Sequence, residues 1–298
     1  MPKINFETRD EWLQERSFGL GGSDIAAIIG KDDYRTPLDV YLDKTGQSNK
    51  VFTDEQQANM DRGHILEKPL LEWLRLQNVA GDFEHNTSLY IDDNDSIYRC
   101  TPDGIGENVI IEAKSTSLFI DEVLPKWFIQ GQWNLGVTGK EFLYIVWING
   151  RLKFQYSRYR RDNELIEFLQ KTAKDFWNNN ILTRTPPNAV NSKDIQKLFE
   201  RHVEGKAVEL SLEQYSIFND LVSIKDKIKA LENNEEELSE KIKMIMQDSE
   251  SLTYGGKVIA SWKSTESNRF DTTSFKKIMP ELYHQFTKPS ISRRFLIK

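Results

Sequence analysis

The sequence predicts an α/β protein that continues into a long helical segment and a small C-terminal region. Helical spacing of apolar residues alternates with short β-branched runs up to about residue 180. Asn149-Gly150 separates two apolar runs, which is a strong signal for a β-hairpin. Over 221–245, apolar residues follow alternating three- and four-residue steps, which indicate a coiled coil or a helical hairpin bent at 233–234.

Helices dominate the expected N-terminal part. A first helix is predicted around Glu11 to Arg16. After a Gly-rich turn, Ser23 or Asp24 is expected to cap a second helix that begins with the apolar run 25–29. Apolar spacing predicts two more helices, and a polar stretch between them predicts a mobile loop: helices near 37–44 and over 65–77, and a loop at 46–57.

Strands and helices then alternate along the chain. Gly104, Gly106 and Asn108 predict a turn between two strands. The expected elements are strands at 88–92, 98–101 and 109–114, a helix at 125–136, strands at 141–148 and 152–157, a helix at 165–178 and a linker at 185–188. The C-terminal region is expected to form strands at 252–253 and 257–263, a helix at 273–278 and a strand at 292–297. Three domains are therefore predicted, at 1–188, 189–250 and 251–298.

Composition limits the class of protein. The net charge is −6, but residues 251–298 carry nine Lys and Arg against three Asp and Glu, so basic charge is concentrated at that end. The single cysteine, Cys100, excludes an internal disulfide and a four-cysteine metal site. The N-terminus lacks the apolar centre of a signal peptide, and no apolar run approaches the roughly 20 residues of a membrane span. A cytoplasmic protein without membrane contact is expected.

Asp103, Glu112 and Lys114 form the most informative pattern in the chain. The run 109–114 is β-branched and strand-like, and side chains of a strand alternate between its faces, so Glu112 and Lys114 project from the same face. If the segment that ends at Asp103 pairs with this strand, Asp103 approaches the same face. Two carboxylates and an amine would then converge, which suits a hard divalent cation and a group that positions a nucleophile.

This pattern resembles the PD-(D/E)xK nuclease superfamily, with the motif standing as Pro102-Asp103 and Glu112-Ala113-Lys114. The order of further positions is similar to that of the lambda-exonuclease-like group, particularly the YqaJ-type viral recombinase nucleases. These positions lie in the Gly-rich turn, in Arg62-Gly63-His64-Ile65-Leu66-Glu67 and in Ile129-Gln130-Gly131-Gln132. The resemblance covers roughly residues 9–180, with a weaker likeness over 254–298. It implies a restriction-endonuclease-like mixed sheet flanked by helices.

The resemblance also implies roles for individual residues. Asp103 and Glu112 would be metal-ligating carboxylates, joined by Glu67 from its helix. Lys114 would orient or deprotonate the attacking water, and Gln130 would fix Lys114 or that water. The metal would be Mg²⁺, with Mn²⁺ as a substitute. Structural interpretations stay open, because a glutamate near a helix start also favours the helix dipole.

A second set of residues would bind a terminal 5′-phosphate, namely Arg16, Ser23 and Thr101. Thr101 departs from the serine of the family, although its hydroxyl offers the same hydrogen bonds. Gln132 would support the site. Gly131 replaces the usual apolar residue, which predicts a local irregularity in that helix. Ser23 could equally serve only as a helix cap, and Arg16 only as an exposed charge.

The function predicted from these residues is a metal-dependent 5′-to-3′ exonuclease that resects the ends of double-stranded DNA. The resemblance further implies a single-strand annealing protein as partner and a homo-oligomer, preferably a trimer. The alternatives are an endonuclease on the same fold and a non-catalytic DNA-binding recombination scaffold. In the basic C-terminal region, Trp262, Arg293 and Arg294 are candidate contacts to DNA or to the partner, and simple packing is the competing interpretation.

Overall fold

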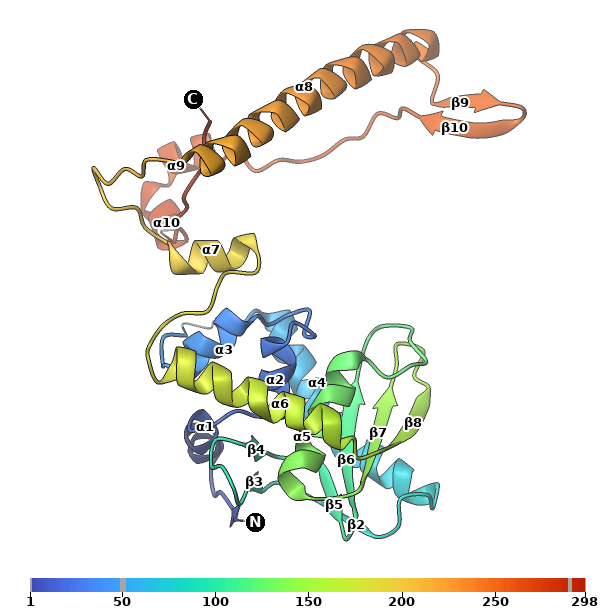
Figure 1. The fold of residues 1–298 in the computed structure, drawn as a ribbon. Helices are drawn as coiled ribbons and strands as arrows, with labels where there is room; N and C mark the ends of the chain where they lie inside the picture. Colours follow the sequence, from blue (N-terminus) through green and yellow to red (C-terminus); the bar gives the residue numbers. More distant parts are fainter. Residues whose placement is uncertain (1, 49–51, 289–290, 298) are drawn as a thin grey trace. The chain divides into compact units, whose positions relative to one another are not determined.

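The computed structural model describes residues 2–48, 52–288 and 291–297. It divides into two compact units, Met1–Ile195 and Gln196–Lys298. The first unit holds the main sheet, and the second is dominated by one long helix (Figure 1). No helix in the described ranges combines the length and the apolar character needed to cross a membrane.

A five-stranded sheet forms the centre of the first unit, in the order β2-β5-β6-β7-β8. Its strands are β2 (Phe83–His85), β5 (Gly104–Gly106), β6 (Val109–Ser115), β7 (Phe142–Ile148) and β8 (Phe154–Arg160). β6 and β7 are parallel, and the other neighbours are antiparallel. A parallel pair needs a crossover connection, which α5 (Pro125–Thr138) supplies. The predicted α/β class with a mixed sheet flanked by helices is confirmed.

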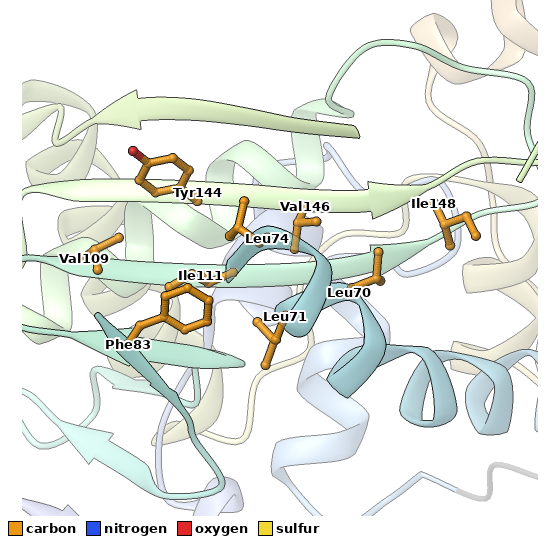
Figure 2. Close-up of a cluster of buried hydrophobic side chains, with 9 residues drawn as sticks. All are labelled: Leu70, Leu71, Leu74, Phe83, Val109, Ile111, Tyr144, Val146 and Ile148. Carbon is orange, nitrogen blue, oxygen red and sulfur yellow. The ribbon is translucent and has the colours of Figure 1, made fainter. Parts of the chain in front are cut away.

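Helices cover both faces of this sheet. On one face α4 (Asp54–Leu76) buries Leu70, Leu71 and Leu74 against a cluster that includes Ile111 and Val146 (Figure 2). Burial of each such side chain contributes about 1.5–3 kcal/mol. The intervening residues of β6 and β7 pack in a second cluster with side chains of α5 and α6 (Asn163–Phe176). The central strands are therefore apolar on both faces, apart from the charged end of β6.

Short helices and a small sheet border the central layers. They are α1 (Arg9–Ser17), α2 (Gly22–Ile28), α3 (Pro37–Lys44) and η1 (Trp177–Ile181), with β1 (Lys3–Ile4), β3 (Leu89–Ile91) and β4 (Arg99–Cys100) in the order β1-β3-β4. Gly22 allows a close approach of α2 to α5, because a Cβ at this position would lie 2.8–3.0 Å from atoms of Gln130. This approach brings the Gly-rich turn to the helix that carries Gln130.

Several local predictions were wrong. Glycines 104 and 106 lie in strand β5, not in a turn. Glycine is needed at 106 for a close approach of two backbones, because a Cβ there would lie 2.4 Å from the carbonyl oxygen of Asp82. α4 begins at Asp54, inside the expected loop 46–57, of which residues 49–51 lie outside the described residues. α5 continues through Gly131 without irregularity, since the missing Cβ leaves room for Leu143. Ser23 and Asp24 lie inside α2, whose N-cap is Gly21.

The second unit contains α8 (Leu212–Met246), β9 (Ser251–Tyr254), β10 (Lys257–Ser261), α9 (Thr272–Ile278) and α10 (Pro280–Gln285), and α7 (Ser192–Leu198) spans the boundary between the units. α8 is continuous, so the bend considered at 233–234 is absent. No strand forms over 291–297, where one was expected. Asp194 belongs to the first unit, in which it is buried and accepts a hydrogen bond from Thr36. The predicted division at residue 250 stays a prediction.

Candidate active site

Pairing of β5 with β6 brings the acidic residues of the motif together. Gly104 lies opposite Ile111, so Asp103 reaches the end of β6 that carries Glu112 and Lys114. The backbone N–H of Ala113 donates to Oδ2 of Asp103 at 2.7 Å. The Nζ of Lys114 lies 3.8 Å from the same oxygen. The structure thus brings together the three residues that the strand pattern predicted.

Glu112 is the most enclosed member of this group, with no exposed surface. Its Oε2 accepts hydrogen bonds from Nζ of Lys114 at 2.6 Å and from Nε2 of Gln130 at 2.8 Å. Its Oε1 accepts from the side-chain amide of Asn134, one turn further along α5. Sequence reasoning assigned no role to Asn134, because an amide on a buried helix face has no distinctive pattern. Three donors therefore fix the orientation of this carboxylate.

Electrostatics in this group depend on burial. Burial raises the pKa of Asp103 to about 8, with Lys114 lowering it and the charges of Glu112 and Glu67 raising it. Burial alone would lower the pKa of Lys114, but Glu112 and Asp103 outweigh it, so the pKa lies above its usual value. Lys114 is accordingly an ammonium that neutralises part of the crowded negative charge. Such crowding is typical of functional sites.

Glu67 approaches from α4 and has its own partner. Its Oε1 lies 2.7 Å from Nε2 of His85, the residue of β2 that pairs with Gly104. His85 was not predicted, since one histidine on an edge strand has no motif around it. The contact holds Glu67 on the side of the sheet where Asp103 lies.

The carboxylates of Glu67, Asp103 and Glu112 have the oxygen donors that Mg²⁺ and Mn²⁺ prefer. In the part of the chain that the structure describes, no three His, Cys, Asp or Glu side chains lie close enough together to form a metal centre. The charges of Glu112 and Glu67 nevertheless add to burial in raising the pKa of Asp103, so the three carboxyl groups influence one another. By its chemistry, the donor set fits a hard divalent cation.

A second polar cluster forms around the end of α1. Nη2 of Arg16 donates to Oγ of Ser23 at 2.7 Å, and the guanidinium stacks on the ring of Trp12 with 4.9 Å to the centroid. Nε1 of Trp12 donates to Oγ1 of Thr101 at 3.3 Å. The three residues predicted for phosphate binding are therefore connected through Trp12, which the sequence analysis did not select. A guanidinium with adjacent hydroxyl groups suits an anion.

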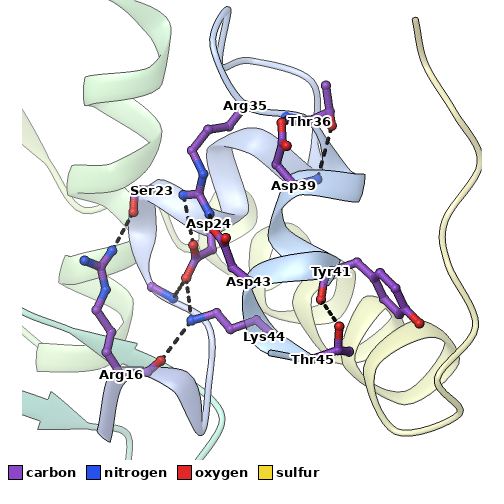
Figure 3. A network of polar contacts seen from close by, with 11 residues as sticks. Arg16, Ser23, Asp24, Arg35, Thr36, Asp39, Tyr41, Asp43, Lys44 and Thr45 are labelled. Atoms are coloured by element: carbon purple, nitrogen blue, oxygen red, sulfur yellow. Dashed lines mark hydrogen bonds and ion pairs between the residues drawn. The ribbon is translucent and has the colours of Figure 1, made fainter. Parts of the chain in front are cut away.

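Asp24 lies beside Ser23 and anchors this cluster (Figure 3). Its carboxylate accepts from Arg35, from Lys44 and from the backbone N–H of Gly21, each at 3.0 Å. Lys44 also donates to the carbonyl oxygen of Arg16 at 2.8 Å. Burial raises the pKa of Asp24, but the charges of Lys44, Arg16 and Arg35 outweigh it and hold the pKa far below its usual value. The end of α1 is thereby tied to the start of α2.

Both clusters line one cleft of about 500 Å³. Its lining includes residues expected to hold metal or water and residues expected to hold phosphate: Glu67, Asp103, Gln130, Arg16, Ser23 and Thr101. His64, Asn86 and Asn134 lie in the same wall. Glu112 and Lys114 stand directly behind Asp103 and Gln130, to which they are bonded or adjacent.

Comparison with known proteins places this cleft in a family. The sequence profile of the YqaJ-like viral recombinase domain matches residues 11–141, a range that contains every predicted site residue of the first unit. The uncharacterized protein YqaJ of Bacillus subtilis (strain 168) is 31% identical, with 98% of this chain and 94% of the relative covered. The chain belongs to the YqaJ-like viral recombinase family.

Solved structures with a similar arrangement are more distant from this YqaJ-like protein. An alkaline exonuclease from Laribacter hongkongensis is 18% identical, with a TM-score of 0.49 over 59% of this chain and 94% of that one. Its complex with dAMP is matched at 16% identity and a TM-score of 0.49, over 63% and 97% of the two chains. A putative exonuclease from Eubacterium rectale is 9% identical, with a TM-score of 0.47 over 69% and 97%.

Gln132 is the one predicted site residue of the first unit of the YqaJ-like protein that points elsewhere. It is fully buried, its Nε2 donates to the carbonyl oxygen of Arg160, and its Oε1 accepts from the backbone N–H of Asp162. These contacts join α5 to the connection between β8 and α6. Gln132 therefore supports the fold from outside the cleft.

The remaining candidates lie in the second unit. Trp262 is 49% exposed, and Arg294 is exposed. Nη1 of Arg293 donates to the carbonyl oxygen of Phe199 at 2.9 Å, within the same unit. Arg293 thus has a structural contact in addition to its predicted role.

Proposed function

We propose that this YqaJ-like protein is a metal-dependent nuclease that degrades double-stranded DNA from its 5′ ends. The observation that carries the proposal is the shared cleft, in which Glu67 and Asp103 adjoin a cluster of guanidinium and hydroxyl groups, with Lys114 in contact behind Asp103. An acidic cluster alone fits any phosphodiesterase. The adjoining donors favour an enzyme that holds a terminal phosphate while it cleaves the next bond.

In the proposed reaction, Glu67, Asp103 and Glu112 hold Mg²⁺, with Mn²⁺ as a substitute. The bound cation supplies Lewis acidity towards the phosphate and neutralises developing charge. Lys114 is 17% exposed and ion-paired to Glu112, so it can present its ammonium to the attacking water and orient it. Gln130 holds the same oxygen of Glu112 as Lys114 does, and so positions both side chains.

The 5′-phosphate is proposed to bind between Arg16, Ser23 and Thr101. Trp12 stacks on Arg16 and donates to Thr101, so these groups are pre-arranged before DNA binds. Pre-arranged charged donors bind an oxyanion more strongly than mobile ones because little side-chain entropy is lost. Gly21 and Gly22 of the Gly-rich turn lie beside them in the cleft, and the N–H of Gly21 is already bonded to Asp24.

The decisive experiment compares linear duplex labelled at each 5′ end with a covalently closed circle of the same sequence. We expect Mg²⁺-dependent release of the label from the linear DNA and no nicking of the circle. Asp103→Asn should abolish release. Asp121→Asn is the matched control, because Asp121 is half exposed, lies outside the cleft, and forms ion pairs with Arg151 and Lys153 and a long hydrogen bond with Asn149.

The two alternatives predict different results in this experiment. An endonuclease on the same fold would cleave the circle. A non-catalytic recombination scaffold would bind the linear DNA without releasing the label in either Mg²⁺ or Mn²⁺. Asp103, Glu112 and Lys114 are all retained and in contact, which favours catalysis over the scaffold.

The wider assembly is also a proposal. We expect a homo-oligomer, with a trimer preferred, because an acidic protein gains little from general phosphate attraction and must retain DNA in another way. A single-strand annealing protein is the expected partner. Trp262, Arg293 and Arg294 of the basic C-terminal region, 251–298, are proposed to contact single-stranded DNA or this partner, since rings and cations together suit exposed bases and phosphates.

A further inference from the structure

The long helix α8 carries an apolar stripe whose side chains stay exposed. Its residues alternate in three- and four-residue steps and so occupy the a and d positions of a heptad repeat. We call this set the α8 stripe: Ile217, Leu221, Ile224, Ile228, Leu231, Leu238, Ile242 and Ile245. Leu221 is half-buried, and the others are between 40% and 68% exposed. Glu235 takes one a position and is the only charged residue among them.

The extent of the α8 stripe matches a coiled coil better than a packing face within a domain. α8 has 35 residues and runs without interruption (Figure 1). Four heptads of this kind are enough for stable pairing of two helices, whereas a single exposed helix would leave its apolar side chains in water. The charged residues that flank the stripe indicate which binding partner can pack against it.

We propose that the α8 stripe binds the α8 stripe of a second copy of this chain, with the two helices antiparallel and fully overlapped. In this alignment Ile217 faces Ile242 of the second copy, Leu221 faces Leu238, and Ile228 faces Leu231. The centre of the alignment falls near residue 229, which is the middle of Leu212–Met246. The paired layers therefore extend from 217 to 242 of each helix, and they are apolar except for the two that contain Glu235.

Flanking charges are complementary in this alignment. Residues at e positions meet e positions of the other helix, and residues at g positions meet g positions. Lys225 then lies beside Glu232 of the second copy, and Asp220 beside Lys241, each twice by symmetry. A shift by one heptad in one direction would bring Lys225 against Lys225 of the second copy. A shift in the other direction would bring Glu232 against Glu232, so both shifts place like charges together. The charges thus select one antiparallel register.

Glu235 decides between antiparallel and parallel pairing. A parallel pair in register would also have opposite charges at its flanks, with Asp220 beside Lys225 and Lys227 beside Glu232 of the second copy. It would, however, place two Glu235 carboxylates against each other in the apolar seam, where like charges repel strongly. In the antiparallel pair Glu235 faces Ile224 of the second copy and lies next to its Lys225, which provides a counter-charge.

The first test measures the mass of the full chain by sedimentation over a range of micromolar concentrations. Ile228→Asp places a charge in the centre of the stripe, and we expect it to raise the dissociation constant at least about 100-fold, on the scale of an uncompensated charge in an apolar contact. Ser223→Asp adds the same charge outside the stripe and should associate like the wild type. An unchanged mass in Ile228→Asp with retained helical content would overturn the proposal, as would a wild-type protein whose mass shows no association at these concentrations.

A charge swap then tests the orientation. Lys225→Glu and Glu232→Lys should each weaken association by roughly tenfold, because each replaces two attractive pairs with two repulsive ones. The double variant K225E/E232K restores opposite charges in the antiparallel pair, so association should return to the wild-type value. In a parallel pair the double variant would keep both repulsions. Failure of the double variant to recover, or single variants without effect, would therefore refute antiparallel pairing. Cleavage activity is not part of either readout, so the result does not depend on the nuclease proposal. The two-fold α8 contact would join copies from two of the proposed trimers, so its loss lowers the mass while the trimer remains.

Discussion

The Nζ of Lys114 lies 2.6 Å from Oε2 of Glu112, two residues earlier on the same strand. Because Glu112 is fully buried, its charge depends on this ammonium and on the two amides that share the carboxylate. Removal of one partner from a buried ion pair leaves an uncompensated charge and costs about 3–5 kcal/mol. The ion pair therefore gives Lys114 a structural role in addition to its proposed catalytic one.

This double role predicts how Lys114→Met behaves. Turnover should fall by roughly 10² or more, as for loss of a positioned acid–base group. Thermal stability should fall too, but Mg²⁺ should restore part of it, because a cation can replace the lost positive charge beside Glu112. The measurement is the Tm of variant and wild type with and without Mg²⁺.

Lys153→Met is the matched control, since Lys153 is 58% exposed and pairs only with the surface residue Asp121. It should lose neither activity nor the wild-type response of Tm to Mg²⁺. A Lys114→Met protein with full turnover, or with the same Mg²⁺ response as the control, would contradict the assigned role.

The two motif acids should respond differently to substitution. Asp103→Asn and Glu112→Gln should both abolish cleavage, because each removes a carboxylate that is proposed to bind the metal. Glu112→Ala should additionally destabilise the fold, since it leaves the buried amides of Gln130 and Asn134 without an acceptor, at about 1–3 kcal/mol for each unsatisfied group. Urea unfolding of the three variants separates the effects. Equal stability of Glu112→Ala and Glu112→Gln would show that the amides find other partners.

Substrate ends provide a separate prediction. Duplex with a 5′-phosphate should be degraded faster than duplex with a 5′-hydroxyl, because only the phosphate reaches Arg16, Ser23 and Thr101 with its charge. Arg16→Ala should erase most of this difference while cleavage of the 5′-hydroxyl substrate changes little. The ratio of the two rates is the measurement. A wild-type ratio close to one would mean that this cluster binds another part of the DNA.

Much of the site follows from the sequence, and the reason lies in strand geometry. Alternation along β6 predicted that Glu112 and Lys114 share a face, and the pairing of Gly104 with Ile111 brings Asp103 to them as expected. The helices that cover the sheet also follow from apolar spacing. Strand alternation and helical spacing extend over a few neighbouring residues, so a short stretch of sequence is enough to predict them.

Other parts could not be predicted, because they depend on contacts between distant segments. His85 is bonded to Glu67 only because β2 pairs with β5, and β5 is a strand of glycines that looks like a turn. Asp24 was predicted as a possible helix cap, but it is surrounded by Arg35 and Lys44. Arg35 precedes α3, and Lys44 is the last residue of α3. The residues next to a side chain in the sequence do not indicate which distant segments it contacts in the fold.

Asp24 predicts the dependence of stability on pH. Its pKa in the folded state lies far below the unfolded value of 3.8, because Lys44, Arg16 and Arg35 outweigh the effect of burial. Its charge thus contributes stability that is fully present above pH 3.8 and is lost as the pH falls below that value. Asp24→Asn should cost about 3 kcal/mol or more at pH 7, as for a broken buried pair.

The measurement is urea unfolding of wild type and Asp24→Asn between pH 7 and pH 3. The difference in unfolding free energy between the two proteins should stay constant down to about pH 5 and shrink at lower pH. Asp24 then becomes protonated in the unfolded wild type, which stabilises its unfolded state, whereas the asparagine of the variant does not titrate. Asp43→Asn serves as control, since Asp43 also pairs with Arg35 but is 25% exposed, and its loss should be smaller. A difference that stays constant to pH 3 would refute the contribution of the Asp24 charge.

The basic C-terminal region, residues 251–298, supplies the last prediction. Arg293→Glu with Arg294→Glu should weaken binding of single-stranded DNA and lower the slope of log affinity against log salt by about 1 for each lost phosphate contact. Arg293 also donates to the carbonyl oxygen of Phe199, so the double variant removes a structural contact together with a charge. Arg294→Glu alone separates the two effects and should keep about half of the change in slope. Glu281→Gln is a control that alters charge in the same unit without adding a repulsion to DNA. If affinity and slope are unchanged in both arginine variants, and binding of the annealing protein is also unchanged, these cations serve only solubility and packing.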